Sequence, residues 1–257
     1  MIYEEGKINP VDAKKLAVDV EDTFGIKCKY MGSIFKDIEG KDKKNLALEI
    51  AKTRVKDIYK EKEAEPLPME INYEERKIEG KAGYGVVYDG FMLCGILMKF
   101  FPFKIGKEIR VLITDRLIAT FDTDRRYHLR TCILSGGWSI LSTNGLVHAP
   151  ARPREFYIAK RALGDRMDGV ASKKIESFLG DRFLKENDPR LHDAMLSLIL
   201  QAFFYSEFGE GFCSEKKCRL FNPHWQEEVI DALVQKRELG LCDKHKEMLY
   251  RLKNDED

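Results

Sequence analysis

The chain has 257 residues, enough to bury a full apolar core. Hydrophobic residues make up 44% of it and charged residues 34%, and 44 Lys and Arg nearly balance 43 Asp and Glu. This balance argues against a nucleic-acid partner, because neutralising many phosphates needs a basic excess. Residues 1–20 lack a secretion-signal pattern, and the apolar run 91–103 is interrupted by Gly95, Lys99 and Pro102. We therefore expect a cytoplasmic protein without a membrane span.

Helical and strand patterns alternate in the first part of the chain. Asn9 is a suitable capping residue, Pro10 fits the first turn of a helix, and Gly25 lies where that helix should end. The elements expected here are a strand within 1–8, a helix from 10 to 24, a strand at 26–31, a helix around 46–51 and an exposed charged connection at 56–68.

Strands dominate the middle of the chain, and helices follow them. The run IRVLI at 109–113 is β-branched and bounded by charges, so it predicts a central strand buried on both faces. Further elements expected here are a strand at 85–90, a helix at 91–101, strands at 117–121, 129–134 and 138–141, and helices after 159. A helix capped by Asp188 should be buried nearly all round, because apolar residues cover most of its circumference.

Three cysteines and a histidine near the C-terminus have the spacing of a zinc site. Cys213 and Cys218 form Cys-x4-Cys, and Cys242 and His245 form Cys-x2-His after 23 intervening residues. Two closely spaced pairs let two loops supply four tetrahedral ligands, and four protein ligands make a structural site. The alternative is a group of buried thiols beside an exposed histidine. His224 is a rival ligand, but it has no cysteine at the x2 spacing.

The segment between the two pairs predicts a helix that the metal would clamp at both ends. Asn222-Pro223 indicates its start, and Trp225, Val229, Ile230 and Leu233 would form its buried side.

The segments ILQAFFYSEFGEGFCSEKKC and VLITDRLIATFD resemble archaemetzincins, proteases with an HExxHxxGxxH motif directly before a cysteine-rich structural zinc site. VLITDRLIATFDTDRRYH, STNGLVHAPARPREFY and CRLFNPHWQEEVIDAL are more similar still to an uncharacterised archaeal family described as metallopeptidases. That similarity extends over most of the chain. It implies a metzincin-like fold, zinc and peptide hydrolysis.

The motif that would hold the catalytic zinc is degenerate in this chain. A zincin needs two histidines one helical turn apart and a carboxylate that takes a proton from water. Alanine and phenylalanine offer no donor atom, and serine is a poor zinc ligand. The resemblance aligns Gly209 with the motif's glycine, Ala202, Ser206 and Phe212 with its histidines, and Phe203 with its glutamate. One structural zinc is therefore expected, while a second, catalytic ion lacks ligands.

Other polar residues are candidates if the chemistry has moved. Asp and His at strand ends and in loops are common metal ligands and acid–base groups, although charged turns and surface ion pairs explain most such residues. His128 and Arg154 are favoured, because basic side chains near a strand end can receive an anionic group. The candidates are Asp115, Asp122, Asp124, Arg126, His128, His148, Arg152, Arg154, Glu155, His224 and Glu227.

Together these patterns predict an α/β (α+β) fold, with a mixed twisted sheet, flanking helices and a zinc-stapled helical C-terminal subdomain. We expect an α/β core at 1–190 and the subdomain at 191–257; whether 1–66 form a separate lobe stays open. The favoured function is a metallopeptidase-fold protein that has a structural zinc and has lost the standard catalytic motif. The alternative is a non-catalytic zinc protein that binds a peptide, protein or nucleic acid. Basic residues of the zinc region alternate with acids, which disfavours nucleic acid.

Overall fold

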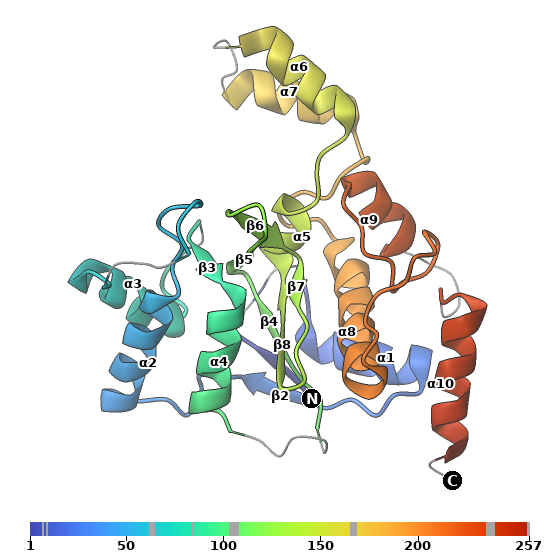
Figure 1. Cartoon of the computed structure of the whole chain (residues 1–257), viewed down its shortest axis with the longest axis horizontal. Coiled ribbons are helices and arrows are strands. Elements are labelled where there is room, and N and C mark those ends of the chain that lie inside the picture. Colours follow the sequence, from blue (N-terminus) through green and yellow to red (C-terminus); the bar gives the residue numbers. More distant parts are fainter. Residues whose placement is uncertain are drawn as a thin grey trace.

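The computed structural model describes residues 1–6, 8, 10–61, 65–83, 85–102, 108–164, 169–234 and 240–255 (Figure 1). The strands are β1 (Ile2–Glu4), β2 (Tyr30–Ser33), β3 (Val87–Asp89), β4 (Arg110–Thr114), β5 (Leu117–Phe121), β6 (Tyr127–Arg130), β7 (Cys132–Ile133) and β8 (Trp138–Ser142). The helices are α1 (Ala13–Phe24), α2 (Gly40–Lys52), α3 (Pro68–Ile78), α4 (Gly90–Phe100), α5 (Thr143–His148), α6 (Arg154–Leu163), α7 (Gly169–Leu179), α8 (Leu191–Phe208), α9 (Gln226–Ala232) and α10 (Asp243–Asp255).

The main sheet has the strand order β2-β1-β4-β8-β7. Its first four strands are parallel, and β7 joins the edge antiparallel to β8. β4 lies at the centre, as the IRVLI run predicted, and its residues alternate between the two faces. Val111 and Ile113 pack into one apolar cluster and Leu112 into the other. The mixed α/β prediction is therefore confirmed.

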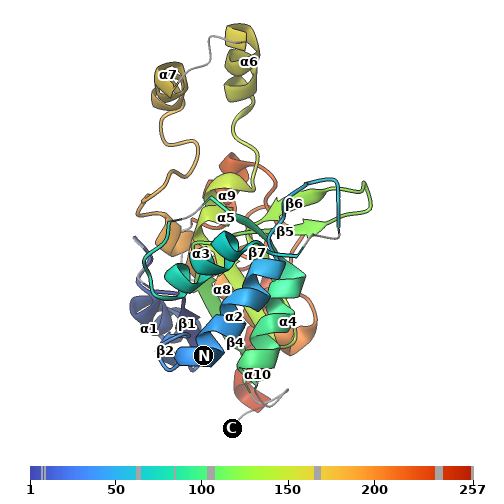
Figure 2. The ribbon, with the colours of Figure 1, turned by 90° about the vertical axis from the view of Figure 1, so that its left-hand side faces the viewer.

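Helices cover both faces of this sheet (Figures 1 and 2). α1 and α8 contribute to the cluster that contains Val111, while α2 and α4 contribute to the cluster that contains Leu112. A smaller sheet, β3-β5-β6, adjoins the main one. The predicted buried helix is α8, and its buried residues lie on every side. Because α8 shares one cluster with α1, β1 and β4, both predicted parts of the chain contribute to the same core; the boundary at 190 stays a prediction.

Several predicted boundaries were wrong. Helix α1 begins at Ala13 rather than in the turn after Pro10, because the Asp12 carboxylate accepts the N–H groups of Lys14 and Lys15, both at 3.0 Å; Asn9 lies outside the described residues. The prediction that Gly25 ends this helix is confirmed, with a left-handed φ of 65°.

The helix expected to be capped by Asp188 begins only at Leu191. The predicted strand 26–31 is observed at Tyr30–Ser33. The predicted strand 129–134 is divided between β6 and β7 at Thr131, whose carbonyl accepts the Ser142 N–H. Pro68, expected in an exposed connection, begins α3.

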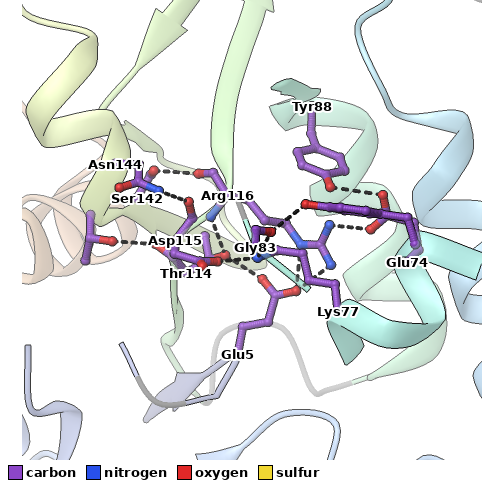
Figure 3. A network of polar contacts seen from close by, with 12 residues as sticks. Glu5, Glu74, Lys77, Gly83, Tyr88, Thr114, Asp115, Arg116, Ser142 and Asn144 are labelled. Atoms are coloured by element: carbon purple, nitrogen blue, oxygen red, sulfur yellow. Dashed lines mark hydrogen bonds and ion pairs between the residues drawn. The ribbon is translucent and has the colours of Figure 1, made fainter. Parts of the chain in front are cut away.

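A buried ion-pair network closes the carboxyl edge of the main sheet (Figure 3). Arg116 follows β4, and its Nη1 lies 2.6 Å from Glu74 of α3, while its Nε donates to Glu5 after β1 at 2.6 Å. All three side chains are buried. Nearby, Lys77 of α3 contacts Asp115 at 2.7 Å. These contacts fix α3 across the strand ends.

Candidate metal centre and adjoining cavity

The predicted zinc residues follow the turn that ends α8. Gly209 adopts a left-handed φ of 70°, which glycine tolerates best, and the chain turns into the loop that contains Cys213 and Cys218. That loop is folded by backbone hydrogen bonds from Cys213 N–H to the Leu220 carbonyl at 2.7 Å and from Cys218 N–H to the Glu215 carbonyl at 3.0 Å. Cys242 directly precedes α10, and His245 lies in the first turn of that helix.

The four side chains converge. One ligand atom from each of Cys213, Cys218, Cys242 and His245 lies within 4.8 Å of the others. The sulfurs of Cys213 and Cys242 are 3.9 Å apart, and His245 Nδ1 is 3.7 Å from the sulfur of Cys218 and 3.0 Å from that of Cys242. Zinc at about 2.3 Å from sulfur and about 2.0 Å from nitrogen would separate tetrahedral ligands by about 3.5–3.8 Å. The donor set and its spacing therefore fit a tetrahedral divalent ion.

Burial disfavours the charged forms of three of the four side chains. It raises the pKa of Cys213 and raises that of Cys218 to about 12, and it lowers the pKa of His245. Backbone N–H groups oppose the rise: Glu215 N–H donates to the sulfur of Cys213 at 3.3 Å, and the N–H groups of Cys242 and Leu220 donate to Cys218. N–H donors aimed at sulfur stabilise thiolates, the form that binds metal.

His245 also has an unsatisfied atom. Its Nε2 is buried and has no hydrogen-bond partner among the described residues, while its ring packs edge-on against Phe204 at 5.3 Å. The ring is therefore positioned by packing, with Nδ1 toward the cysteines. His224, the rival ligand, does not belong to the cluster.

The helix between the two cysteine pairs is shorter than predicted. α9 has seven residues, and Trp225 precedes it with 42% of its surface exposed, so the prediction that Trp225 belongs to its buried side was wrong. Val229 and Leu233 are buried as predicted. The physical reason is a capping arrangement at 224–228, in which the Glu228 carboxylate accepts the N–H groups of His224 and Trp225 and turns the chain before the helix begins.

The positions that the resemblance aligns with catalytic residues do not meet at one site. Ala202 is fully buried in the core. Phe203 and Ser206 line a cavity of about 830 Å³ between α1, α8 and α10, and Phe212 lines a separate cavity of about 470 Å³. The described part of the chain holds one group of three or more His, Cys, Asp or Glu side chains close enough together to bind a metal ion. That group is Cys213, Cys218, Cys242 and His245.

The smaller cavity collects three of the catalytic candidates. His128 of β6 and His224 before α9 both line it, beside Asp122 and Arg130. His128 Nε2 lies 2.9 Å from the carboxylate of Asp124, and Arg130 Nε donates to the Thr120 hydroxyl at 2.7 Å. Arg130 also pairs with Asp122 at 2.5 Å, so the cavity is polar on its β6 side.

The other candidates lie elsewhere. Asp115 pairs with Lys77 at the carboxyl edge of the sheet, and Arg154 is the first residue of α6. Neither lines the cavity. His148 faces Glu186 at 3.8 Å, and burial lowers its pKa.

Three further candidates form ion pairs near α6. Arg152 pairs with Glu176 at 2.5 Å, and Arg182 joins Glu155 at 3.0 Å to Glu227 at 2.6 Å. These residues therefore form surface ion pairs, the explanation that holds for most charged residues in loops.

Sequence reasoning missed several residues that line the cavity. Tyr205 faces it from α8, and Asn222 and Arg130 face it from a loop and from β6. Tyr205 and Phe212 were both within the degenerate motif segment, but adjacent helix positions differ by about 100° in direction, so Tyr205 and Ser206 line different cavities. No periodicity could have indicated which side faces solvent.

A mixed α/β protein with a Cys3His cluster at its C-terminal end is the class that fold and site define. Residues 1–252 match the family described as "Probable metallopeptidase family (DUF6775)". The chain belongs to this family, as its sequence resemblance predicted.

Among solved structures, the chain is similar to an archaemetzincin from Methanopyrus kandleri. The two share 13% sequence identity with a TM-score of 0.49, over 98% of this chain and 93% of that one. No curated protein matches the chain. Across the described residues, we find no helix with both the length and the apolarity that a bilayer crossing demands.

Proposed function

We propose that this metallopeptidase-family protein uses zinc to stabilise its fold and binds a peptide or protein segment without zincin-type hydrolysis. The observation that carries the proposal is the contrast between two regions. Four donor atoms converge at Cys213, Cys218, Cys242 and His245, whereas the aligned motif positions on α8 carry alanine, phenylalanine and serine.

Zinc is favoured over other ions by the ligand chemistry. Three thiolates and one imidazole suit Zn²⁺, and oxygen-preferring cations such as Mg²⁺ and Ca²⁺ are disfavoured. Four protein ligands leave no open position for water or substrate, which supports a structural role. Because α10 carries His245 and Leu249 reaches the core, the ion would link this last helix to the body.

Binding is favoured over zincin chemistry because the helix offers no ligand pair one turn apart. The 470 Å³ cavity has the size of a site for a small ligand or a short peptide segment, and both apolar and polar side chains line it. A rearranged hydrolase is the second candidate, since His128 and His224 line this one cavity. It would need a further metal or an acid–base pair assembled there.

Metal analysis of the full chain separates the two. We expect one zinc per chain in the purified protein, loss of that zinc in Cys213→Ser, and retention in the matched control Cys28→Ser, whose thiol lies outside the cluster. Peptide hydrolysis should be absent in all three proteins. A second zinc that survives Cys213→Ser and disappears in His128→Ala together with peptidase activity would establish the hydrolase, and a metal-free protein would refute the structural site.

A further inference from the structure

Two of the three cysteines in the metal cluster are accessible from solvent. Cys213 and Cys242 are partly exposed, whereas Cys218 is only 1% exposed. The sulfurs of Cys213 and Cys242 are 3.9 Å apart. A disulfide needs about 2.05 Å between its sulfurs, so these two side chains have to close by about 2 Å, a distance within reach of side-chain rotation. The two sulfurs that solvent reaches are therefore also close enough to bond to each other.

The two chain segments that carry this pair are joined by contacts that use no metal ligand. Lys244, two residues after Cys242, pairs at 2.6 Å with the carboxylate of Glu210, three residues before Cys213. On the other side of the cluster, the Arg219 N–H donates to the Gly240 carbonyl at 2.9 Å. The two segments are thus tied together on both sides of the cysteine pair, and these contacts keep the pair together when a metal ion leaves.

Metal binding makes these sulfurs reactive toward oxidants. A coordinated thiol loses its proton, and the thiolate is the form that attacks a peroxide. Burial shields the sulfur of Cys218 from a peroxide in solution. The N–H groups of Leu220 and Cys242 also donate to Cys218 and hold it in place. The reactive thiolates that a peroxide can reach are therefore those of Cys213 and Cys242.

We propose that Cys213 and Cys242 form a disulfide when the chain meets hydrogen peroxide, and that this bond releases the zinc. The inference rests on the structural zinc of the proposed function. One thiolate attacks the O–O bond, which breaks to give a sulfenic acid and hydroxide. The second thiolate attacks the sulfenic sulfur, forms the S–S bond and expels a second hydroxide. The two thiolates together lose two electrons, and the peroxide gains them.

The disulfide takes over the cross-link that the metal provides. Cys218 and His245 remain as ligands, and two ligands do not complete the tetrahedral set that holds zinc. The new bond nevertheless links the same loop to the start of α10, the helix at the edge of the molecule (Figure 1). The chain therefore releases its metal ion under peroxide without releasing its last helix. A link between Cys213 and Cys218 would lie within one loop and leave α10 without a cross-link.

The test oxidises the zinc-loaded full chain with a small excess of hydrogen peroxide. A chromogenic chelator measures released zinc, thiols are titrated in denaturant, and mass spectrometry of proteolytic peptides identifies the linked cysteines. We expect one zinc released for each disulfide, a fall in free thiols from six to four because one disulfide consumes two, and a Cys213–Cys242 peptide pair. Dithiothreitol with added zinc should restore the metal content.

Two variants and a melting experiment complete the test. Cys242→Ser should abolish the disulfide, and Cys28→Ser, which removes a partly exposed thiol outside the cluster, is the matched control and should change neither the linkage nor the zinc release. Because Cys242→Ser also removes a zinc ligand, the peptide linkage in the unmodified chain is the deciding measurement. The oxidised zinc-free chain should melt at a higher temperature than the reduced chain stripped by a chelator, because the disulfide constrains the unfolded state.

A zinc-loaded chain that keeps its metal under peroxide would refute the proposal. So would zinc release with sulfinic acids in place of a disulfide, or with a linkage through Cys218. An oxidised chain that melts no higher than the reduced zinc-free one would show that α10 is not retained. A chain that binds no zinc before the oxidant is added fails the proposed function itself, so the two failures are distinguishable.

Discussion

Replacing Arg116 with methionine tests the energetic role of the buried network. Methionine retains an unbranched side chain but removes the positive charge. Glu5 and Glu74 then stay buried without the guanidinium that pairs with them. Glu74 keeps Arg54, whose Nε lies 3.0 Å away, whereas among the described residues Glu5 keeps the hydroxyl of Thr114. Removing one partner of a buried ion pair costs about 3–5 kcal/mol, because the remaining charge is not compensated. We expect a loss in that range, a large part of a typical domain's 5–15 kcal/mol.

Urea unfolding followed by tryptophan fluorescence measures this loss. Trp138 is fully buried and packs 5.0 Å from Tyr3, so its emission reports the exposure of the core. The double variant Arg116→Met/Glu5→Gln should recover at least about 1 kcal/mol, because it removes the carboxylate that the single variant leaves unpaired. The control Arg251→Met, which removes an exposed pair on α10, should leave the free energy of unfolding unchanged within error.

A decrease below about 1 kcal/mol for Arg116→Met would refute the reasoning, since it would mean that the two carboxylates gain water or protons without cost. A double variant less stable than the single one would show that Glu5 stabilises the fold by contacts other than its charge.

Two further predictions concern a close packing contact and pH. Gly145→Ala should destabilise the protein by about 1–3 kcal/mol in the same urea assay, because a Cβ there would lie 2.4 Å from the Arg130 carbonyl oxygen and 2.9 Å from Ser142 Cβ. Gly95→Ala, where a Cβ meets nothing within 4 Å on an exposed helix position, should instead stabilise by about 0.5–1 kcal/mol; the same sign for both would contradict this. Burial lowers the pKa of His148 below its unfolded value near 6.5, so its contribution to stability is present above that pH and is lost as the pH falls. His148→Gln should flatten the decline in melting temperature between pH 7 and about pH 5.5, and an unchanged pH profile would count against the assignment.

Local patterns predicted those parts of the fold that local forces determine. The β-branched run at 109–113 and the all-round apolar pattern of α8 both gave buried elements, because burial on every side leaves a sequence signature without knowledge of the partners. The spacing of Cys213, Cys218, Cys242 and His245 likewise indicated convergence, since each pair lies in one short loop or helical turn.

Contacts between distant segments were beyond that reasoning. Arg116 and Glu5 are 111 residues apart, and nothing in either neighbourhood indicates that the two side chains are paired. The projection of α6 and α7 from the body was also missed (Figure 1). These helices are amphipathic like those of any helical subdomain, and the sequence does not reveal that they pack on each other instead of on the body. Trp225 was assigned to the core because apolar residues usually are, but the chain turns before the helix begins.

The strand order of the main sheet reverses direction at β1, between β2 on one side and β4 on the other. In open parallel sheets, the crevice beyond such a reversal is where ligands commonly bind. Here the side chains of Glu5 and Arg116 fill it. A mutation that reopened this crevice would also remove the ion pair that links the ends of β1 and β4, so gaining a ligand there would cost stability. New binding properties should therefore arise more readily on the opposite border, where β6, β7 and the end of α8 surround a space that is already open.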